Sequence, residues 1–148
     1  MIQYQQGDVL KSNAFVISHG CNCRGGFGAG IAYQIAKKYP HVREAYLAKY
    51  RETDSWKLGD VQFVPLDDTK TSFIANCATQ DTYRGPGVHF NEQAFKTCME
   101  KVKQFANGKS IAMPKIGAGL ARGNWERIEV ILNQVFDAND HVTVYVLE

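Results

Sequence analysis

The hydrophobic positions of the chain alternate between short strand-like runs and longer runs with helical spacing. Apolar runs of strand length lie at Ile2 to Gln5, Ala14 to Ser18, Val61 to Val64, Ser72 to Ala75, Ser110 to Met113 and Val142 to Leu147. Apolar residues at helical intervals predict helices over Gly28 to Lys38, His41 to Tyr50, Asn91 to Phe105 and Asn124 to Val135. Pro40 marks the end of the first helix, and Asn91 and Asn124 are placed to cap the last two.

This order of elements predicts the fold class. Strands that alternate with helices favour a three-layer α/β/α sandwich around a mixed, mostly parallel central sheet. The runs Val61 to Val64 and Ser72 to Ala75 flank an Asp67-Asp68 turn, so we expect that pair to be antiparallel. A chain of 148 residues, 45% of them hydrophobic, has the size of one domain, so we expect a single domain over residues 1–148.

Two glycine-rich segments carry the candidate chemistry. The first runs from Gly25 to Gly30 and the second from Gly117 to Leu120, and each lies between a strand-like and a helix-like run. Glycine lets the backbone approach a ligand closely, and helix N-termini offer free N–H groups at a positive dipole end. In open α/β sheets, ligands bind beyond the carboxyl ends of the strands, where these loops belong. Together the two segments predict a cradle for a pyrophosphate.

Neither segment has the sequence of a common phosphate-binding loop. A Walker loop needs Lys followed by Ser or Thr after its last glycine, but Gly30 is followed by Ile31 and Ala32. The dinucleotide pattern G-x-G-x-x-G fits neither register, because it would end at Ile31 or at Tyr33. The first loop therefore binds phosphate through its backbone alone, or it is a turn that only reverses the chain.

Charge and composition limit the partners. The net charge is +2, and no Lys/Arg run exceeds the pair Lys37-Lys38, so there is no strong nucleic-acid signal, whereas a small anionic ligand is compatible. We find no membrane-spanning run and no signal-peptide pattern, so we expect a cytoplasmic protein without a membrane partner.

The four cysteines are expected to be free thiols, because no secretory signal accompanies them. His19, Cys21 and Cys23 alternate, so on an extended segment they can share one face and hold a metal. A second ligand pair at a matching distance is missing from the sequence, and we therefore predict no metal site and no cofactor.

Over nearly its whole length the sequence resembles the macrodomain family of ADP-ribose binders. The matching stretches, in chain order, are Gly7 to Leu10, Val16 to Cys23, Gly28 to Ala32, Ala112 to Leu120 with Trp125-Glu126, and Thr143 to Leu147. Within the family it looks most similar to the branch of the fungal-type ADP-ribose-1''-phosphate phosphatase and the terminal ADP-ribose protein glycohydrolase. The run from His19 to Pro40 is especially similar to the phosphatase.

The resemblance implies a role for each matching residue. Asp8 would accept a hydrogen bond from the adenine amine, Val9 would help to hold the ring, and Tyr145 would pack against it. Asn22 would bind the hydroxyls of the distal ribose. Phosphate contacts would come from the backbones of Gly28, Ala29, Gly30 and Ile31 in the first loop, and of Gly117, Ala118, Gly119 and Leu120 in the second. The alternatives are that Asp8 only forms a turn, that Asn22 bonds its own loop, and that Tyr145 is a core aromatic.

The catalytic residues of the glycohydrolase relatives are absent. Those enzymes use a lysine as nucleophile and an acidic residue in the second loop, but the segment Ala75 to Thr79 has no lysine and the acidic position holds Ala121. His19 stands where the phosphatase-like relatives also have histidine, and an imidazole transfers protons near neutral pH. We therefore predict His19 as general acid or base. Gln80 and Tyr83 are candidates to reach the distal ribose.

Three functions share the predicted cradle. The leading prediction is that the protein binds ADP-ribose and hydrolyses the phosphate of ADP-ribose-1''-phosphate. The alternatives are a non-catalytic reader of free or protein-linked ADP-ribose, and a hydrolase that releases ADP-ribose from modified macromolecules by substrate-assisted attack of water.

Overall fold

The sheet of the protein has the predicted mixed, mostly parallel topology. The computed structural model describes residues 2–119 and 121–147. Its strands are β1 (Ile2–Gln6), β2 (Val16–Cys21), β3 (Val61–Pro65), β4 (Phe73–Ala78), β5 (Ser110–Pro114) and β6 (His141–Val146). They form one six-stranded sheet in the order β1-β6-β5-β2-β4-β3. Neighbouring strands are parallel except β3 and β4, which are antiparallel as predicted.

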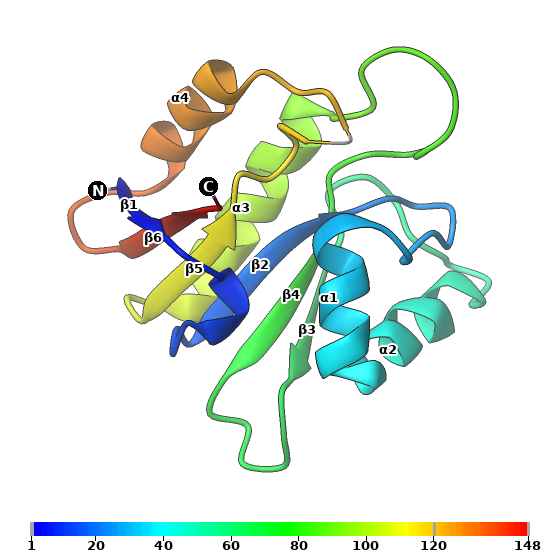
Figure 1. The fold of residues 1–148 in the computed structure, drawn as a ribbon, viewed down its shortest axis with the longest axis horizontal. Coiled ribbons are helices and arrows are strands. Elements are labelled where there is room, and N and C mark those ends of the chain that lie inside the picture. The colour runs from blue at the N-terminus through cyan, green and yellow to red at the C-terminus, as the bar shows by residue number, and fades with distance from the viewer. Residues whose placement is uncertain (1, 120, 148) are drawn as a thin grey trace.

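Two pairs of helices cover the two faces of this sheet (Figure 1). The helices are α1 (Gly30–Lys38), α2 (Pro40–Tyr50), α3 (Glu92–Ala106) and α4 (Trp125–Val135), with a short 3₁₀ helix, η1 (Val9–Lys11), after β1. Buried residues of α1 and α2 pack on one face, and those of α3 and α4 pack on the other. The predicted three-layer α/β/α sandwich is confirmed.

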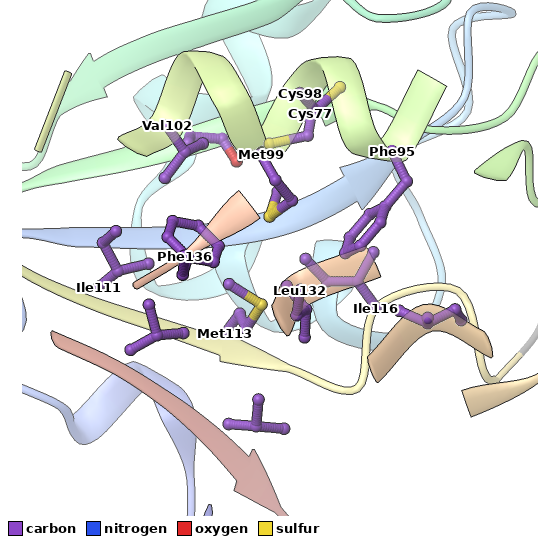
Figure 2. Packing of buried hydrophobic residues seen from close by; sticks show 14 of the residues in the cluster. Cys77, Phe95, Cys98, Met99, Val102, Ile111, Met113, Ile116, Leu132 and Phe136 are labelled. Carbon is purple, nitrogen blue, oxygen red and sulfur yellow. Dashed lines mark hydrogen bonds between the residues drawn. The ribbon is translucent and has the colours of Figure 1, made fainter. Parts of the chain in front are cut away.

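The core divides along the strands because successive side chains point to opposite faces of a sheet. In β2, Val16 packs with the α3 and α4 layer, whereas Ile17 packs with the α1 and α2 layer. Figure 2 shows the buried cluster of the α3 and α4 layer, in which Met99 of α3 and Leu132 of α4 lie against Met113 of β5. The sheet is thus buried on both faces, as parallel sheets usually are.

The N-caps of α3 and α4 are the residues that the sequence predicts. The side chain of Asn91 accepts a hydrogen bond from Ala94 N at 2.8 Å, and that of Asn124 accepts one from Arg127 N at 3.2 Å. These caps satisfy N–H groups that a helix leaves free at its first turn. The start of α3 is therefore fixed directly after the loop that follows β4.

Several boundaries differ from the prediction, by more than one residue in β2, in β4, which ends at Ala78 instead of Ala75, and in α1. The strand expected to end at Ser18 continues to Cys21, because β2 pairs with β4 in register from Val16 opposite Phe73 to Cys21 opposite Ala78. The helix expected to begin at Gly28 begins at Gly30, because Ala29 is extended and Gly30 has a φ of +58°. Within residues 2–119 and 121–147, none of the helices has both the length and the apolar character needed to cross a bilayer.

Candidate functional site

A cavity of about 520 Å³ lies at the carboxyl ends of the central strands, between the two glycine segments. The residues that line it come from the end of β2, the first glycine segment, the start of α1, the segment after β4 and the second glycine segment. They are Gly20, Cys21, Asn22, Gly26, Phe27, Gly28, Ala29, Gly30, Ile31, Ala32, Thr79, Gln80, Tyr83, Pro114, Lys115, Ile116, Gly117, Gly119 and Ala121. The two segments predicted to form one cradle therefore do lie together.

Asn22 shapes the first glycine segment through its own side chain. Its Oδ1 accepts hydrogen bonds from Arg24 N at 2.9 Å and Gly26 N at 3.1 Å, and its Nδ2 donates to Gly26 O at 2.7 Å. Tyr46 of α2 donates its hydroxyl hydrogen to Asn22 O at 2.7 Å. Asn22 lines the cavity, but these bonds match the alternative in which the side chain bonds its own loop.

The start of α1 presents backbone N–H groups to the cavity. Ala29 is the N-cap residue, and within the described chain no side chain caps this helix end. The first N–H groups of an α-helix lack partners inside the helix and lie at its positive dipole end. Because Gly30, Ile31 and Ala32 also line the cavity, this end of α1 is suited to an anionic ligand.

The second glycine segment is held by an aromatic ring. A Cβ on Gly117, whose φ is +81°, would lie 2.2 Å from Cδ1 of Phe90, so a glycine is needed there. The backbone N–H groups of His89 and Phe90 donate to Ala121 O at 2.9 and 3.2 Å. Gly117, Gly119 and Ala121 line the cavity, whereas Ala118 does not appear in its lining. Leu120, also predicted here, lies outside the described residues.

The residues predicted to hold adenine lie beside the cavity, at the ends of β1 and β6. Gly7 N donates to Val146 O at 3.0 Å, and Asp8 Oδ1 accepts from Leu10 N at 2.9 Å. Tyr145 is the partner of Pro114 in the β5–β6 register, and Pro114 lines the cavity. Asp8, Val9 and Tyr145 thus lie near the cavity but do not form part of its wall.

His19 is fully buried and lies outside the cavity lining. The β2–β4 register places it opposite Asn76, and its Nε2 donates to Asn76 Oδ1 at 2.5 Å. Its ring meets Phe27 edge to face, with centroids 5.5 Å apart. Burial lowers the pKa of His19 to about 4, which the bond to Asn76 opposes, so the ring is neutral near pH 7. The imidazole thus contacts Asn76 and Phe27 rather than the cavity, and its role as general acid or base stays a prediction.

The neutral imidazole belongs to a chain of hydrogen-bonded polar side chains that runs through the buried Asn76 to the half-buried Gln62. Asn76 Nδ2 donates to Gln62 Oε1 at 3.0 Å, and Gln62 Nε2 donates to Ala45 O at 2.9 Å. The chain therefore links β2, β4, β3 and α2 beneath the first glycine segment. Buried polar groups that are all satisfied rigidify the structure around them.

The cavity lining carries few groups that transfer protons. Among its described residues, Lys115 is the one lysine, and Asp, Glu and His are absent. The Lys115 ammonium lies over the Trp125 ring, 5.7 Å from its centroid. Burial raises the pKa of the Cys21 thiol well above its usual value, so this thiol stays protonated and is a poor nucleophile. Within the described residues, no group of three or more His, Cys, Asp or Glu side chains is arranged to hold a metal.

Several lining residues were not predicted. Gly20, Thr79 and Ile116 form the floor of the cavity where strands end, and Phe27, within the first glycine segment, is buried in the core. Gln80 and Tyr83, candidates from the sequence, do line the cavity. The floor residues lie at or just after the ends of β2, β4 and β5, so they can be recognised only once the strand boundaries are known.

Comparison with known proteins gives a consistent result. A family model for the Macro domain matches residues 18–132. The chain is 35% identical over 160 residues to an ADP-ribose 1''-phosphate phosphatase of Candida albicans, covering 99% of this chain and 100% of that protein. It is 31% identical over 138 residues to a DNA ADP-ribosyl glycohydrolase of Mycobacterium tuberculosis, covering 92% of this chain and 39% of that protein. A solved structure from Bacteroides thetaiotaomicron, described as a protein of unknown function, superposes with a TM-score of 0.89 at 33% identity, covering 99% of this chain and 98% of that one.

Proposed function

Because the chain belongs to the macrodomain family, we propose that it binds ADP-ribose between its two glycine segments and hydrolyses the phosphate of ADP-ribose-1''-phosphate. The observation that carries this proposal is the single cavity lined by both segments. The similarity to the Candida albicans phosphatase, over nearly the full length of both proteins, supports the choice of reaction.

The ligand runs across the strand ends in the order of the sheet. Adenine lies near Asp8, Val9 and Tyr145 at β1 and β6. The pyrophosphate lies between the segments that follow β5 and β2, where the start of α1 and the second glycine segment offer N–H groups. The distal ribose then reaches the segment after β4, which contains Gln80 and Tyr83.

The reaction requires a water oxygen to attack phosphorus, the bond between phosphorus and the ribose oxygen to break, and that oxygen to gain a proton. The products are ADP-ribose and inorganic phosphate. Positioning and stabilisation of the phosphoryl charge supply most of the catalysis in such reactions. Backbone N–H groups of the two segments serve this purpose. We assign His19 a positioning role in place of the proton transfer first predicted, because its buried neutral ring supports the first segment from below.

Calorimetric titration with ADP-ribose, followed by incubation with ADP-ribose-1''-phosphate and a free-phosphate assay, tests this function. We expect saturable binding and release of phosphate, with release inhibited by added ADP-ribose because both ligands occupy one cavity. Absence of ADP-ribose binding would refute the proposal. Binding without phosphate release would leave the protein a reader or a hydrolase of a different bond.

A second candidate function is release of ADP-ribose from a modified macromolecule. It is favoured by the similarity to the Mycobacterium tuberculosis DNA ADP-ribosyl glycohydrolase, and by a lining in which water must be oriented rather than deprotonated by an acidic side chain. Incubation with ADP-ribosylated DNA and, separately, ADP-ribosylated protein distinguishes it. Free ADP-ribose appears only if the glycosidic bond is cleaved.

We further propose that residues 1–148 act as one domain in the cytoplasm. Both core clusters pack on the same sheet, which supports a single cooperative unit. The four cysteines are buried and free, as is usual for proteins of reducing compartments.

A further inference from the structure

Two buried hydroxyl groups of the described chain lack a hydrogen-bond partner, Ser18 Oγ and Thr79 Oγ1. Nearly all buried polar groups in proteins are paired, so an unpaired one calls for a physical reason. Ser18 lies within β2 and is outside the cavity lining, whereas Thr79 directly follows β4 and lines the cavity. Both oxygens are buried, but of the two residues Thr79 alone borders the cavity.

The backbone of Thr79 is fixed from both sides. Its N–H donates to Cys21 O at 3.1 Å, and its carbonyl accepts from Asn91 N at 2.7 Å, at the cap of α3. The residue is 1% exposed. A hydroxyl on such a rigid support is already oriented before a ligand arrives, and a hydrogen bond made there is shielded from water.

Glycine at position 20 makes room for this buried hydroxyl beside β2. A Cβ on Gly20 would lie 2.6 Å from Thr79 Oγ1 and 3.1 Å from Cγ2 of Ile116. Gly20, Thr79 and Ile116 all line the cavity, and among these three floor residues the Thr79 hydroxyl is the one polar side-chain group.

The sheet order indicates which part of the ligand meets Thr79. The strands run β6, β5, β2, β4, and the two glycine segments follow β5 and β2. Thr79 follows β4, one strand beyond the phosphate-binding pair and on the side away from Asp8 and Tyr145. Adjacent strands are ~4.8 Å apart, so this position lies beyond the pyrophosphate along the ligand.

We infer that Thr79 Oγ1 is a binding group for the distal ribose of ADP-ribose, hydrogen-bonded to one of its hydroxyls. The inference rests on the proposed function and adds a contact that selects ADP-ribose over ADP, which lacks that ribose. In the free protein the unpaired hydroxyl is a cost to stability, which the ligand relieves.

The test compares Thr79→Val, which keeps the shape and removes the hydroxyl, with Thr79→Ser, which keeps the hydroxyl. Calorimetry should show ADP-ribose binding to Thr79→Val weakened roughly 3- to 10-fold, as for loss of one neutral hydrogen bond. ADP binding should stay unchanged, and Thr79→Ser should bind ADP-ribose within about 2-fold of the wild type. The melting temperature of ligand-free Thr79→Val should equal or exceed that of the wild type.

Ser18→Ala is the matched control, because it removes the other unpaired buried hydroxyl at a position away from the cavity. It should leave the affinity for ADP-ribose unchanged. Equal binding of ADP-ribose by Thr79→Val and wild type would overturn the inference, as would an equal loss of ADP binding. A lower melting temperature for ligand-free Thr79→Val would assign the hydroxyl to the fold instead. If the wild type itself fails to bind ADP-ribose, the proposed function fails with it, which is a separate outcome.

Discussion

At the scale of single residues, the site depends on polar side chains that are used to build it. The side chain of Asn22 makes three hydrogen bonds within its own loop, and that of His19 is hydrogen-bonded to Asn76. Both residue types are common ligand-binding groups, which is why the sequence suggested direct roles for them. Their burial instead indicates that they hold the backbone from which the N–H groups of the first glycine segment project.

The buried His19 should make stability depend on pH. Burial lowers the pKa of His19 from 6.5 to about 4, so between these two pH values the unfolded chain binds a proton at this residue that the folded chain does not bind. Folding free energy contributed by the neutral ring is present above 6.5 and is lost as the pH falls toward 4, by on the order of 3 kcal/mol. Urea unfolding of wild type and His19→Gln between pH 7 and 4 measures this. The difference between the two should shrink or reverse as the pH falls, and parallel profiles would contradict the assignment.

At the scale of elements, the second glycine segment is locked to the segment before α3. The ring of Phe90 occupies the space that side chains on Gly117 and Gly123 would need. The same short segment bonds Ala121 through the backbone of His89 and Phe90 and provides the Asn91 cap of α3. One wall of the cavity is therefore coupled to the start of a core helix.

A methyl group on Gly117 should push the second glycine segment away from the ring of Phe90. Gly117→Ala places a Cβ 2.2 Å from Phe90 at a φ of +81°, so we expect a loss of about 1–3 kcal/mol of stability and weaker ADP-ribose binding. Gly119→Ala is the control for stability, since a Cβ there meets nothing within 4 Å. Thermal unfolding of the two variants checks the difference. Equal melting temperatures would show that Phe90 moves freely.

The elements themselves were predictable because each must bury an apolar face, and the hydrophobic period records that requirement. The end of β2 was missed because His19 and Gly20 are not apolar, and their place in the strand depends on pairing with β4. For the same reason the partner of His19 was not visible from the sequence. The glycine segments were recognised at once, whereas Thr79 required the cavity, the sheet order and its unpaired hydroxyl together.

At the scale of the whole molecule, the sheet order places the proposed binding positions in a linear series along the carboxyl ends of the strands. The β3–β4 turn lies at the opposite edge, since it precedes β4 whereas the cavity follows it (Figure 1). Asp8 and Thr79 mark the two ends of the series. Recognition of the base and of the distal ribose should therefore be separable.

Replacement of Asp8 should change which base is preferred. In the proposed complex the Asp8 carboxylate accepts a hydrogen bond from the adenine amine, whereas Asp8→Asn retains an oxygen for Leu10 N and adds a donor that suits the carbonyl of hypoxanthine. We expect Asp8→Asn to lower the preference for ADP-ribose over its inosine analogue by roughly 10-fold. Titration with both ligands measures this ratio. Asp68→Asn, in the turn at the far edge, should keep the wild-type ratio, and an unchanged ratio in Asp8→Asn would exclude contact with the base.

The hydroxyl of Tyr46 accepts from Gly25 N at 3.1 Å, and its backbone carbonyl accepts from Trp56 Nε1 at 3.0 Å. Trp56 is thus linked through Tyr46 to the first glycine segment, while the Trp125 ring lies against the ammonium of Lys115, two residues before the second segment. These are the two tryptophans of the chain. The protein therefore carries one tryptophan fluorophore near each glycine segment, and the light emitted by each tryptophan depends on the local environment of a different segment.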